Sequence, residues 1–366
     1  MKLLQIYNFA PHYRAAIFQL MDSALGCDFV FGDKVEDIKK MDYRLLSHKV
    51  TEVHNIRFRH CYYQRGVPTM IRQKYDTFLI LGEPRCISTW LFLVGSLFYP
   101  RKRIFLWSHG WLGKENGMKR MIGRLFYYFC DGAFIYNERS RELMVKGGIP
   151  GNKLTTIYNS LDYDKQLAIR KTLQPSSIYK DHFKNENKNI VFIGRLTAIK
   201  RLDLLINAVS EMRRRDEIVN VTLIGDGAER EKLEMMVRQQ GLNDQVWFMG
   251  SSYDEQLNAE MIYNADLCVS PGNIGLTAIH VLMFGCPAIT NDDFNHQMPE
   301  FETIVDGKTG SFFQSDGYMS LADTISVWFA SHECEREQVR SNCYNIIDSK
   351  WNPHNQIRIL KEKLGQ

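Results

Sequence analysis

Short apolar runs alternate with amphipathic stretches along the first half of the chain. The runs that are typical of buried strands are LLQIYNF, CDFVFGD, EVHNIRF, DTFLILGEP, RIFLWSHG, GAFIYN and KLTTIYN. Between them, apolar residues recur at helical spacing over residues 14–25, 86–98, 119–130 and 138–146. This alternation predicts a mostly parallel α/β sheet with helices on both faces, which is the doubly wound arrangement.

A second alternating series follows a polar stretch, residues 161–189, which we interpret as a linker plus a surface segment. Its strand-like runs are NIVFIGRL, VTLIGDG, QVWFMG, DLCVSPG, PAITND and GSFF. The pattern therefore predicts two doubly wound domains, residues 1–170 and 171–350, that face each other across a cleft. A final helix, about 351–366, is expected to pack back on the first domain.

Ligands of such sheets bind at the carboxyl ends of the strands. In the first domain the candidate loops at these ends are residues 8–14, 82–85, 108–114 and 137–139. In the second domain the most informative segment is SPGNIGLTAIHVLMFGCPAIT, residues 270–290. We expect a strand end, a turn, and a helix from about 276 to 284 with Asn273 as its N-cap. The amides of residues 274–278 would then be unpaired, which makes a site for an anion.

Composition narrows the class of protein. With 45% hydrophobic and 24% charged residues over 366 positions, the chain is an ordinary globular protein. Its eight cysteines are scattered without a metal-binding spacing, and no signal peptide pattern opens the chain, so we expect reduced thiols in the cytoplasm. The longest apolar run, residues 87–99, is shorter than the roughly 20 residues of a membrane-spanning helix. We interpret it as a buried helix.

Charge is distributed unevenly between the two halves. Residues 1–170 contain 26 Lys plus Arg against 15 Asp plus Glu, whereas the remainder contains 20 against 27. The front half is thus basic, which favours an anionic partner such as a membrane surface or a phosphorylated substrate. A basic solvated surface is the alternative. Nucleic acid is not expected, because no nucleic-acid-binding motif is present.

The segment GRLTAIKRLDLLINAV, residues 194–209, opens the second domain with a strand end and two cations. Gly194 has no side chain and leaves room for a ligand near the backbone. Arg195 and Lys200 follow five residues apart, so that both cations can converge on one diphosphate. The next strand ends in LIGDG, and Gly225, Asp226 and Gly227 form a tight turn there. With Gly250 and Gly272, these glycines would line one edge of the sheet.

These motifs together resemble a known family. The series GRL…K, LIGDG, VWFMG, ADLCVSPG, GL…H…MFGCPAIT and IVDGKTGSFF is similar to the retaining glycosyltransferases of family 4, of the bacterial surface polysaccharide type, which have the GT-B fold. The resemblance is close over residues 190–315, and the first half matches in layout alone. It implies transfer of a sugar from a nucleotide diphosphate sugar to an acceptor hydroxyl, with retained anomeric configuration and no essential metal. We expect a UDP-sugar rather than a GDP-sugar.

The resemblance also implies roles for individual residues of the second domain. Arg195 and Lys200 would bind the donor diphosphate and stabilise the leaving group, which is the largest expected catalytic contribution. Further donor-binding residues implied by the match are Gly194, Asp226, Gly227, Met249, Gly250, Ser251, Asn273, Ile274, Gly275, Leu276, Thr277 and His280.

The chain departs from the family at two positions. Family members carry glutamates eight residues apart, the first holding sugar hydroxyls and the second the ribose, and here these positions are Gly272 and His280. A histidine can still hydrogen-bond a ribose hydroxyl, but glycine offers only backbone. The donor sugar could therefore be held differently, with Asn273 standing in, or by another residue such as Glu300, or the enzyme could be catalytically weak.

In the first domain, WSHGWLGKE contains the best candidate for a catalytic residue. His109 follows a strand end and matches a histidine that faces the donor sugar in similar enzymes; a buried structural histidine is the alternative. The loop YNFAPHYR replaces the glycine-rich loop of the family, and its Asn8, His12 and Arg14 are expected on the acceptor side.

The segment KENGMKRMIGRLFYYF combines cations with apolar residues at helical spacing. Such a helix can lie in a membrane interface, with Lys119, Arg120 and Arg124 contacting anionic lipids. The alternative is a core helix with a solvated basic edge.

These observations lead to one main expectation and two alternatives. We expect a transferase that extends a lipid-linked oligosaccharide in capsule, O-antigen or exopolysaccharide synthesis, peripheral on the inner face of the cytoplasmic membrane. A nucleotide-sugar epimerase of the same architecture is the first alternative. A degenerate protein that binds sugar nucleotides or glycans without turnover is the second, because both family glutamates are missing.

Overall fold

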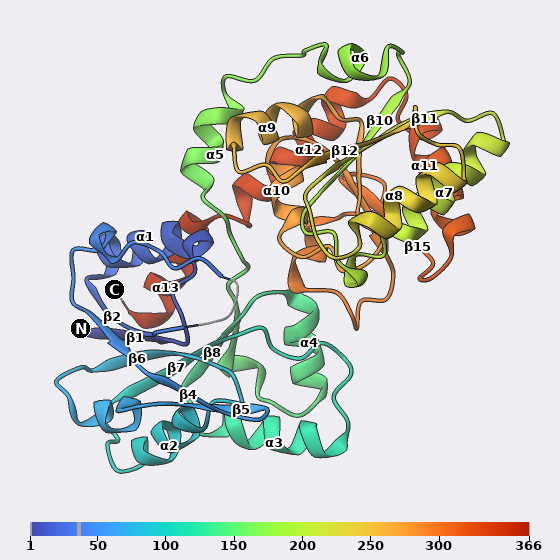
Figure 1. Ribbon diagram of the computed structural model, residues 1–366. Helices are drawn as coiled ribbons and strands as arrows, with labels where there is room; N and C mark the ends of the chain where they lie inside the picture. Colours follow the sequence, from blue (N-terminus) through green and yellow to red (C-terminus); the bar gives the residue numbers. More distant parts are fainter. Residues whose placement is uncertain (1, 35–37, 366) are drawn as a thin grey trace. The chain divides into compact units, whose positions relative to one another are not determined.

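The chain folds into two compact units, each built on one parallel sheet (Figure 1). The computed structural model describes residues 2–34 and 38–365. The first unit comprises Met1–Tyr163 together with Asn352–Gln366, and the second comprises Asp164–Trp351. Residue 366, the last of the expected C-terminal segment, lies outside the described residues.

Within the described residues, the sheet of the first unit has seven strands, all parallel. Its central strands are buried on both faces, which is why they appear in the sequence as continuous apolar runs. The strands, in spatial order, are β3 (Val50–Val53), β2 (Cys27–Gly32), β1 (Leu3–Tyr7), β6 (Thr77–Leu81), β7 (Arg103–Ser108), β8 (Gly132–Ile135) and β9 (Leu154–Thr156).

Helices cover both faces of this sheet (Figure 1). On one face lie α1 (Ala15–Leu25) and α13 (Pro353–Leu364), which pack against each other. On the other face lie α2 (Ile87–Ser96), α3 (Gly117–Tyr128) and α4 (Glu138–Lys146). Gln356 of α13 accepts a hydrogen bond from Ser160 at 2.7 Å, so the C-terminal helix is held within the first unit.

Two expectations for the first unit are wrong in detail. The run EVHNIRF is not one strand: β3 ends at Val53, and β4 (Asn55–Phe58) pairs antiparallel with β5 (Cys61–Gln64) in a separate hairpin. Helix α2 is not fully buried either, because Ile87, Leu91 and Val94 are exposed. The length of an apolar run does not reveal which of its faces the fold covers.

The second unit has six parallel strands in the order β12 (Val246–Gly250), β11 (Val219–Ile224), β10 (Lys188–Ile193), β13 (Leu267–Val269), β14 (Ala288–Asn291) and β15 (Gly310–Phe313). Numbered within the unit, the order is 3-2-1-4-5-6, which is that of dinucleotide-binding folds. The connecting helices are α7 (Leu202–Arg214), α8 (Arg230–Gln239), α9 (Glu255–Asn264), α10 (Thr277–Met283), α11 (Tyr318–Ser331) and α12 (Arg336–Ser349).

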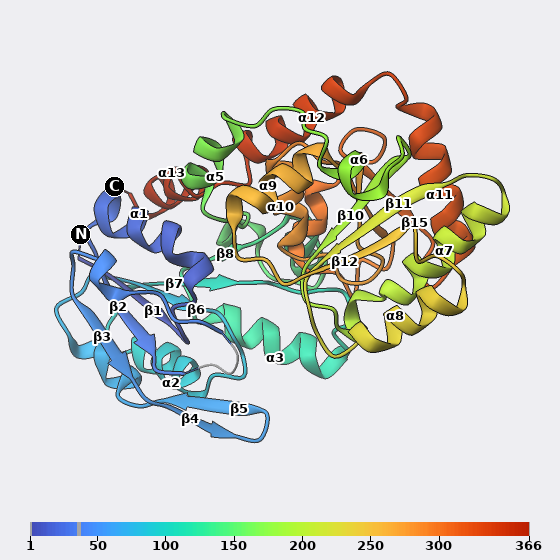
Figure 2. The same cartoon turned by 45° about the horizontal axis from the view of Figure 1, so that its top comes forward.

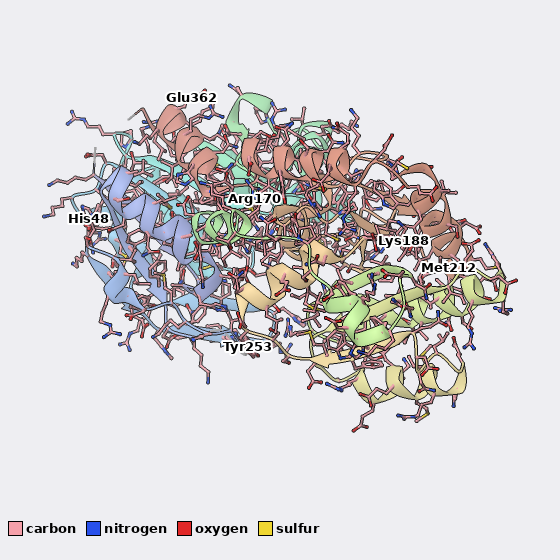
Figure 3. The ribbon with its side chains drawn as sticks, turned by 90° about the horizontal axis from the view of Figure 1, so that it is seen from above. His48, Arg170, Lys188, Met212, Tyr253 and Glu362 are labelled. Atoms are coloured by element: carbon pink, nitrogen blue, oxygen red, sulfur yellow. The ribbon has the colours of Figure 1, made fainter. Side chains whose placement is uncertain are left out.

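The polar stretch after residue 161 contains more structure than expected. It forms α5 (Tyr163–Arg170) and α6 (Ile178–Phe183), and short 3-10 turns occur elsewhere at His12–Arg14, Tyr43–Leu45, Val67–Arg72, Gly151–Lys153, Ala198–Lys200 and Pro299–Thr303. Arg170, labelled in Figure 3, ends α5 and donates to both carboxylate oxygens of Asp348 at 3.0 and 2.8 Å. It also lies over the ring of Tyr344, so α5 is anchored to α12.

Candidate functional site

The strand order of the second unit defines where a ligand is expected. The connections from β10 and β13, which are neighbours at the centre of the sheet, leave toward opposite sides. A crevice forms at such a switch point, outside the carboxyl ends of the two strands. The loop after β10 carries Gly194, Arg195 and Lys200, and the loop after β13 carries Gly272 and the residues that follow. The two sequence motifs predicted to bind the donor are therefore brought together.

Backbone hydrogen bonds join these two loops directly. Gly272 donates from its amide to the carbonyl of Lys200 at 2.9 Å, and Asn273 donates to the carbonyl of Ile199 at 3.1 Å. A Cβ added at Gly272 would lie 1.9 Å from the carbonyl oxygen of Ile199. The close approach of the two backbones explains why glycine occupies the position where a glutamate was expected.

Two neighbouring glycines also allow backbone segments to approach closely. A Cβ at Gly225 would lie 1.9 Å from the carbonyl oxygen of Gly194, and one at Gly227 would lie 2.4 Å from that of Leu196. Gly194 itself has more room, since the nearest atom to an added Cβ is a ring carbon of Phe192 at 3.3 Å. The exposed carboxylate of Asp226 accepts a hydrogen bond from the amide of Gly227 at 2.7 Å, which closes the turn after β11.

Lys200 and Arg195 form the cationic part of the site. The ammonium of Lys200 donates to the carbonyls of Asn273 at 2.5 Å and Ile274 at 3.3 Å. Burial, with the nearby positive charge of Arg195, lowers the pKa of Lys200 to about 8, and the carboxylate of Glu300 opposes part of this shift. Arg195 is exposed and makes no side-chain hydrogen bond or ion pair within the described residues. One cation is thus fixed and the other is available to an anion.

Helix α10 begins differently from the expectation. Its N-cap is Leu276, and the side chain of Asn273 instead donates to the carbonyl of His296 at 2.8 Å. The amide of Ile274 is also not free, because it donates to the side-chain oxygen of Gln297 at 3.0 Å, and Ala278 donates to the carbonyl of Gly275. In the described structure the amides of residues 275–277 remain without a hydrogen-bond partner.

Gln297 holds the loop after β13 in place. Its amide nitrogen donates to the carbonyl of Gly272 at 3.0 Å and to the hydroxyl of Thr290 at 2.9 Å. The hydroxyl of Thr277 donates to the carbonyl of Ile193 at 3.1 Å, which ties the start of α10 to the end of β10. No sequence signal pointed to Gln297, because its partners lie in other segments of the chain.

His280 lies one turn further along α10, where it pairs with a carboxylate. Its Nε2 is 3.0 Å from Glu255 at the start of α9, and Gln166 donates to the same oxygen at 2.9 Å. Burial disfavours the charged carboxylate, but the hydrogen bond with His280 holds the pKa of Glu255 below its usual value. Sequence reasoning missed Glu255; its position near the N-terminus of a helix was the one available signal.

The loop between β12 and α9 adjoins this pair. Met249 and Gly250 are half-buried, Ser251 is exposed, and the carbonyl of Gly250 accepts from the amide of Gly225 at 2.8 Å. Asp254 caps α9 by accepting from the amides of Gln256 and Leu257. Tyr253, labelled in Figure 3, is 98% exposed.

In the first unit, the strand connections reverse between β1 and β6, so the loop after β1 lies at its switch point. The three residues expected on the acceptor side lie in this loop, and they differ in their exposure to solvent. Asn8 is half-buried and its carbonyl accepts from the side chain of Asn55 at 2.8 Å. His12 is exposed, with its Nδ1 3.3 Å from the carbonyl of Lys39.

Arg14, in contrast, is buried among aromatic rings. Its guanidinium lies 5.1–5.7 Å from the ring centroids of Tyr7, Phe18, Trp107 and Tyr136, and donates to the hydroxyl of Tyr136 at 2.5 Å. Burial works against the charge, but the electron-rich tyrosine hydroxyls raise the pKa of Arg14 above its ordinary value. This placement suits a residue that organises the loop rather than one that meets the acceptor directly.

His109 follows β7, and its ring lies 4.7 Å from that of Tyr136. The side chain reaches solvent, yet the protein that surrounds it and the positive charge of Arg14 lower the pKa of His109 to about 4. The imidazole is therefore neutral at pH 7 and suited to hydrogen bonding with an uncharged hydroxyl. The buried structural histidine considered from the sequence does not fit this exposure.

Trp111 fixes the loop that carries His109. A Cβ at Gly123 would lie 2.9 Å from its indole nitrogen, and one at Gly147 would lie 1.9 Å from its ring, so the indole fills the space between α3 and the end of α4. The hydroxyl of Ser108 donates to the carbonyl of Gly82 at 2.8 Å and accepts from the amide of Gly110 at 3.1 Å.

The three expected membrane cations lie on α3. Lys119 and Arg120 are exposed, and their side chains have no hydrogen-bond or ion-pair partner in the described part of the chain. Arg124 donates to the carbonyl of Gly147 and thereby caps the end of α4. Among the described residues no helix is both long and apolar enough to cross a bilayer, and no three His, Cys, Asp or Glu side chains are grouped to hold a metal ion.

Comparison with known proteins gives a family match over part of the chain. Residues 176–345 match the family described as Glycosyl transferases group 1. An uncharacterized 41.2 kDa protein in the cps region of Klebsiella pneumoniae is 27% identical over 73% of this chain, and the match spans 66% of that protein's own length.

Two solved structures have the same fold over the full chain. The Anabaena protein Alr3699/HepE, determined in complex with UDP, has a TM-score of 0.72 at 16% identity, covering 100% of both chains. The apo form of the lipopolysaccharide outer core galactosyltransferase WaaB has a TM-score of 0.73 at 15% identity, covering 99% of this chain and 100% of its own. The predicted fold class is thus confirmed: two Rossmann-like parallel sheets match the GT-B structures, and together with the family match they support a glycosyltransferase enzyme.

Proposed function

We propose that the protein transfers a sugar from a UDP-sugar to an acceptor hydroxyl with retention of anomeric configuration, as the family 4 enzymes do. The observation that carries the proposal is the cation pair Arg195 and Lys200 at the switch point of the second sheet. Structures of the similar Anabaena protein with UDP, and with UDP and glucose, support a uridine donor.

The cation pair suits the bond that must break. In the transfer, the bond between the anomeric carbon and the diphosphate oxygen breaks, and the anomeric carbon bonds to the acceptor oxygen. Negative charge develops on the leaving diphosphate, which takes up the proton of the acceptor hydroxyl. Positive charge at Arg195 and Lys200 stabilises that charge, and the amides of residues 275–277, which have no partner within the described residues, add donors beside it. Because the two cations already supply positive charge, we propose transfer without an essential metal ion.

Residues at the carboxyl ends of the same strands are candidates for binding the ribose, the base and the sugar of the donor. We propose that His280 and Glu255 together receive the ribose hydroxyls, since they present a carboxylate that α10 itself lacks. The loop containing Met249, Gly250 and Ser251 would surround the base. Asn273 and Glu300, both close to Lys200, are the candidates for the sugar hydroxyls.

On the first unit, we propose that His109 contacts the reacting sugar as a neutral hydrogen-bonding group. Arg14 would act as a positioning residue for the loop after β1, and Asn8 and His12 would face the acceptor. The acceptor we propose is a lipid-linked oligosaccharide of surface polysaccharide assembly, at the inner face of the cytoplasmic membrane. Support comes from the cps region that encodes one relative and from the lipopolysaccharide substrate in the name of WaaB.

Turnover of a panel of nucleotide sugars tests this function. We expect nucleotide release from a UDP-sugar that depends on an added lipid-linked acceptor, and an α-linked product from an α-linked donor by NMR. A changed sugar without an acceptor would instead show an epimerase. Tight donor binding with no turnover under any acceptor would show a binding protein, and either outcome would overturn the proposal.

The ionisation of Lys200 makes a separate prediction about pH. A diphosphate binds the protonated amine, whose pKa of about 8 lies below the usual lysine value, so affinity should fall as pH rises above 8. About one tenth of the amine is protonated one unit above its pKa, and UDP affinity at pH 9 should therefore be about tenfold weaker than at pH 7. Calorimetry at both pH values measures the change. In Lys200→Arg the guanidinium stays charged over this range, so UDP affinity in that variant should be the same at both pH values.

A further inference from the structure

The outer side of α2 is an apolar surface without charge. Its sequence ISTWLFLVGS contains no ionisable residue. The helix buries Phe92 and Leu93 against the sheet, while the opposite side and the residues just after it expose Ile87, Leu91, Val94, Leu97 and Phe98. Leu91 is 51% and Phe98 81% exposed to solvent. Large apolar side chains at such exposure are unusual when they form a continuous stripe.

Helix α3 repeats this arrangement with two apolar faces. One face packs Gly123, Phe126 and Tyr127 into the unit. The other follows helical spacing and leaves exposed Met118, Met121, Ile122, Leu125 and Tyr128. Met118 is 70% and Tyr128 72% exposed. These apolar side chains are thus largely exposed to solvent, which does not fit the core helix considered as an alternative from the sequence.

The two stripes belong to one surface. Helices α2 and α3 cover the same face of the first sheet and lie side by side in both views (Figures 1 and 2). The ring of Trp90 on α2 lies 4.9 Å from that of Phe126 on α3, so the helices are in contact. Since both bury their inner sides against the sheet, their exposed stripes point away from it. We call these exposed residues of α2 and α3, with Leu97 and Phe98, the outer face.

The segment that contains α2 and α3 is mostly basic. Residues 84–130 contain eight Lys or Arg and a single acidic residue, Glu115. That carboxylate is already occupied, because it accepts hydrogen bonds from the amides of Leu112 and Gly113 at 2.9 Å. Lys119 and Arg120, in contrast, have no partner among the described residues. An apolar centre with unpaired cations is complementary to a bilayer that contains anionic lipids.

We propose that the outer face docks the first unit on an anionic membrane, with the charge-free stripe of α2 and the apolar stripe of α3 entering the interface and Lys119 and Arg120 meeting the headgroups. A second copy of the chain is a poorer occupant, because pairing this face with itself would oppose cation to cation. The inference deepens the proposed function by naming the surface through which a lipid-linked acceptor would be met. Its test does not require sugar transfer.

Vesicle sedimentation with the full chain tests the outer face. We expect binding to vesicles of phosphatidylcholine with 30% phosphatidylglycerol, and at least tenfold weaker partition to phosphatidylcholine alone. The double variant Leu91→Glu with Leu125→Glu should lose at least tenfold in partition to anionic vesicles, and so should Lys119→Glu with Arg120→Glu. The matched control is Met235→Glu with Val327→Glu, which places the same charges on exposed apolar positions of α8 and α11.

UDP affinity and the thermal unfolding midpoint are measured on every variant, because they report the second unit and the fold independently of lipid. The proposal is supported if the outer-face variants lose vesicle binding while UDP affinity and the unfolding midpoint are preserved. This result would stand even if the protein proved not to transfer a sugar. The proposal is overturned if the unmodified chain does not bind anionic vesicles, or if the control variant loses as much vesicle binding as the outer-face variants. It is also overturned if Lys119→Glu with Arg120→Glu loses vesicle binding while Leu91→Glu with Leu125→Glu keeps it. Dissociation of a dimer by Leu91→Glu with Leu125→Glu, without vesicle binding, would assign the face to a second copy.

Discussion

Replacing Lys200 by alanine should lower the rate of sugar transfer by about 100-fold or more and abolish measurable UDP binding. The ammonium is held against the carbonyls of Asn273 and Ile274, so it needs no rearrangement as charge develops on the leaving diphosphate. Arg195→Ala should lower the rate by about as much, because within the described residues its guanidinium has no hydrogen-bond or ion-pair partner that would hold it away from the diphosphate.

The control for both variants is Arg201→Ala. Arg201 follows Lys200 directly, but its guanidinium pairs with Asp203 and Asp316, away from the switch point. Steady-state rates and calorimetry with UDP on the three variants separate a local role from general loss of positive charge. If Lys200→Ala kept its UDP affinity, or if Arg201→Ala lost as much as the other two, the diphosphate assignment would be wrong.

The sequence was sufficient to predict where Arg195 and Lys200 lie. Both follow a buried strand, and in a parallel sheet every strand ends at the same edge. The same reasoning predicted the loops after β11, β12 and β13, because glycines and turn residues mark each strand end. Parallel order and doubly wound connections therefore followed from local patterns alone, and the structure confirms them.

What the sequence could not predict depends on contacts between distant segments. Asn273 was expected to be the N-cap of α10, but its hydrogen bonds are made elsewhere. Its amide donates to the loop after β10, and its side chain donates to the carbonyl of His296. Gln297 and Glu255 carry no local motif, yet they hold Ile274 and His280. For the same reason, the apolar run of α2 did not reveal that only one of its sides is covered.

Restoring the family glutamate at position 272 should damage the site rather than repair it. A Cβ there meets the carbonyl oxygen of Ile199 at 1.9 Å, and backbone cannot yield as a flexible side chain can. Gly272→Ala should therefore lower the free energy of unfolding by about 2–3 kcal/mol, as overpacking does in a filled core. Gly272→Glu should cost at least as much and should also weaken UDP binding, because the displaced loop carries Lys200.

Chemical denaturation and UDP calorimetry measure these two effects, and Gly95→Ala serves as the matched control. Gly95 lies on α2, where no atom of the described residues is within 4 Å of an added Cβ, so the same substitution there should leave stability unchanged or slightly higher. A stable Gly272→Glu chain with tighter binding of a UDP-sugar would contradict the packing argument, and would show that the loops after β10 and β13 can separate to admit a carboxylate. If Gly272→Ala lost UDP affinity as well as stability, the backbone contact between these two loops would be what holds Lys200 at the diphosphate. No side chain at position 272 would be needed for that role.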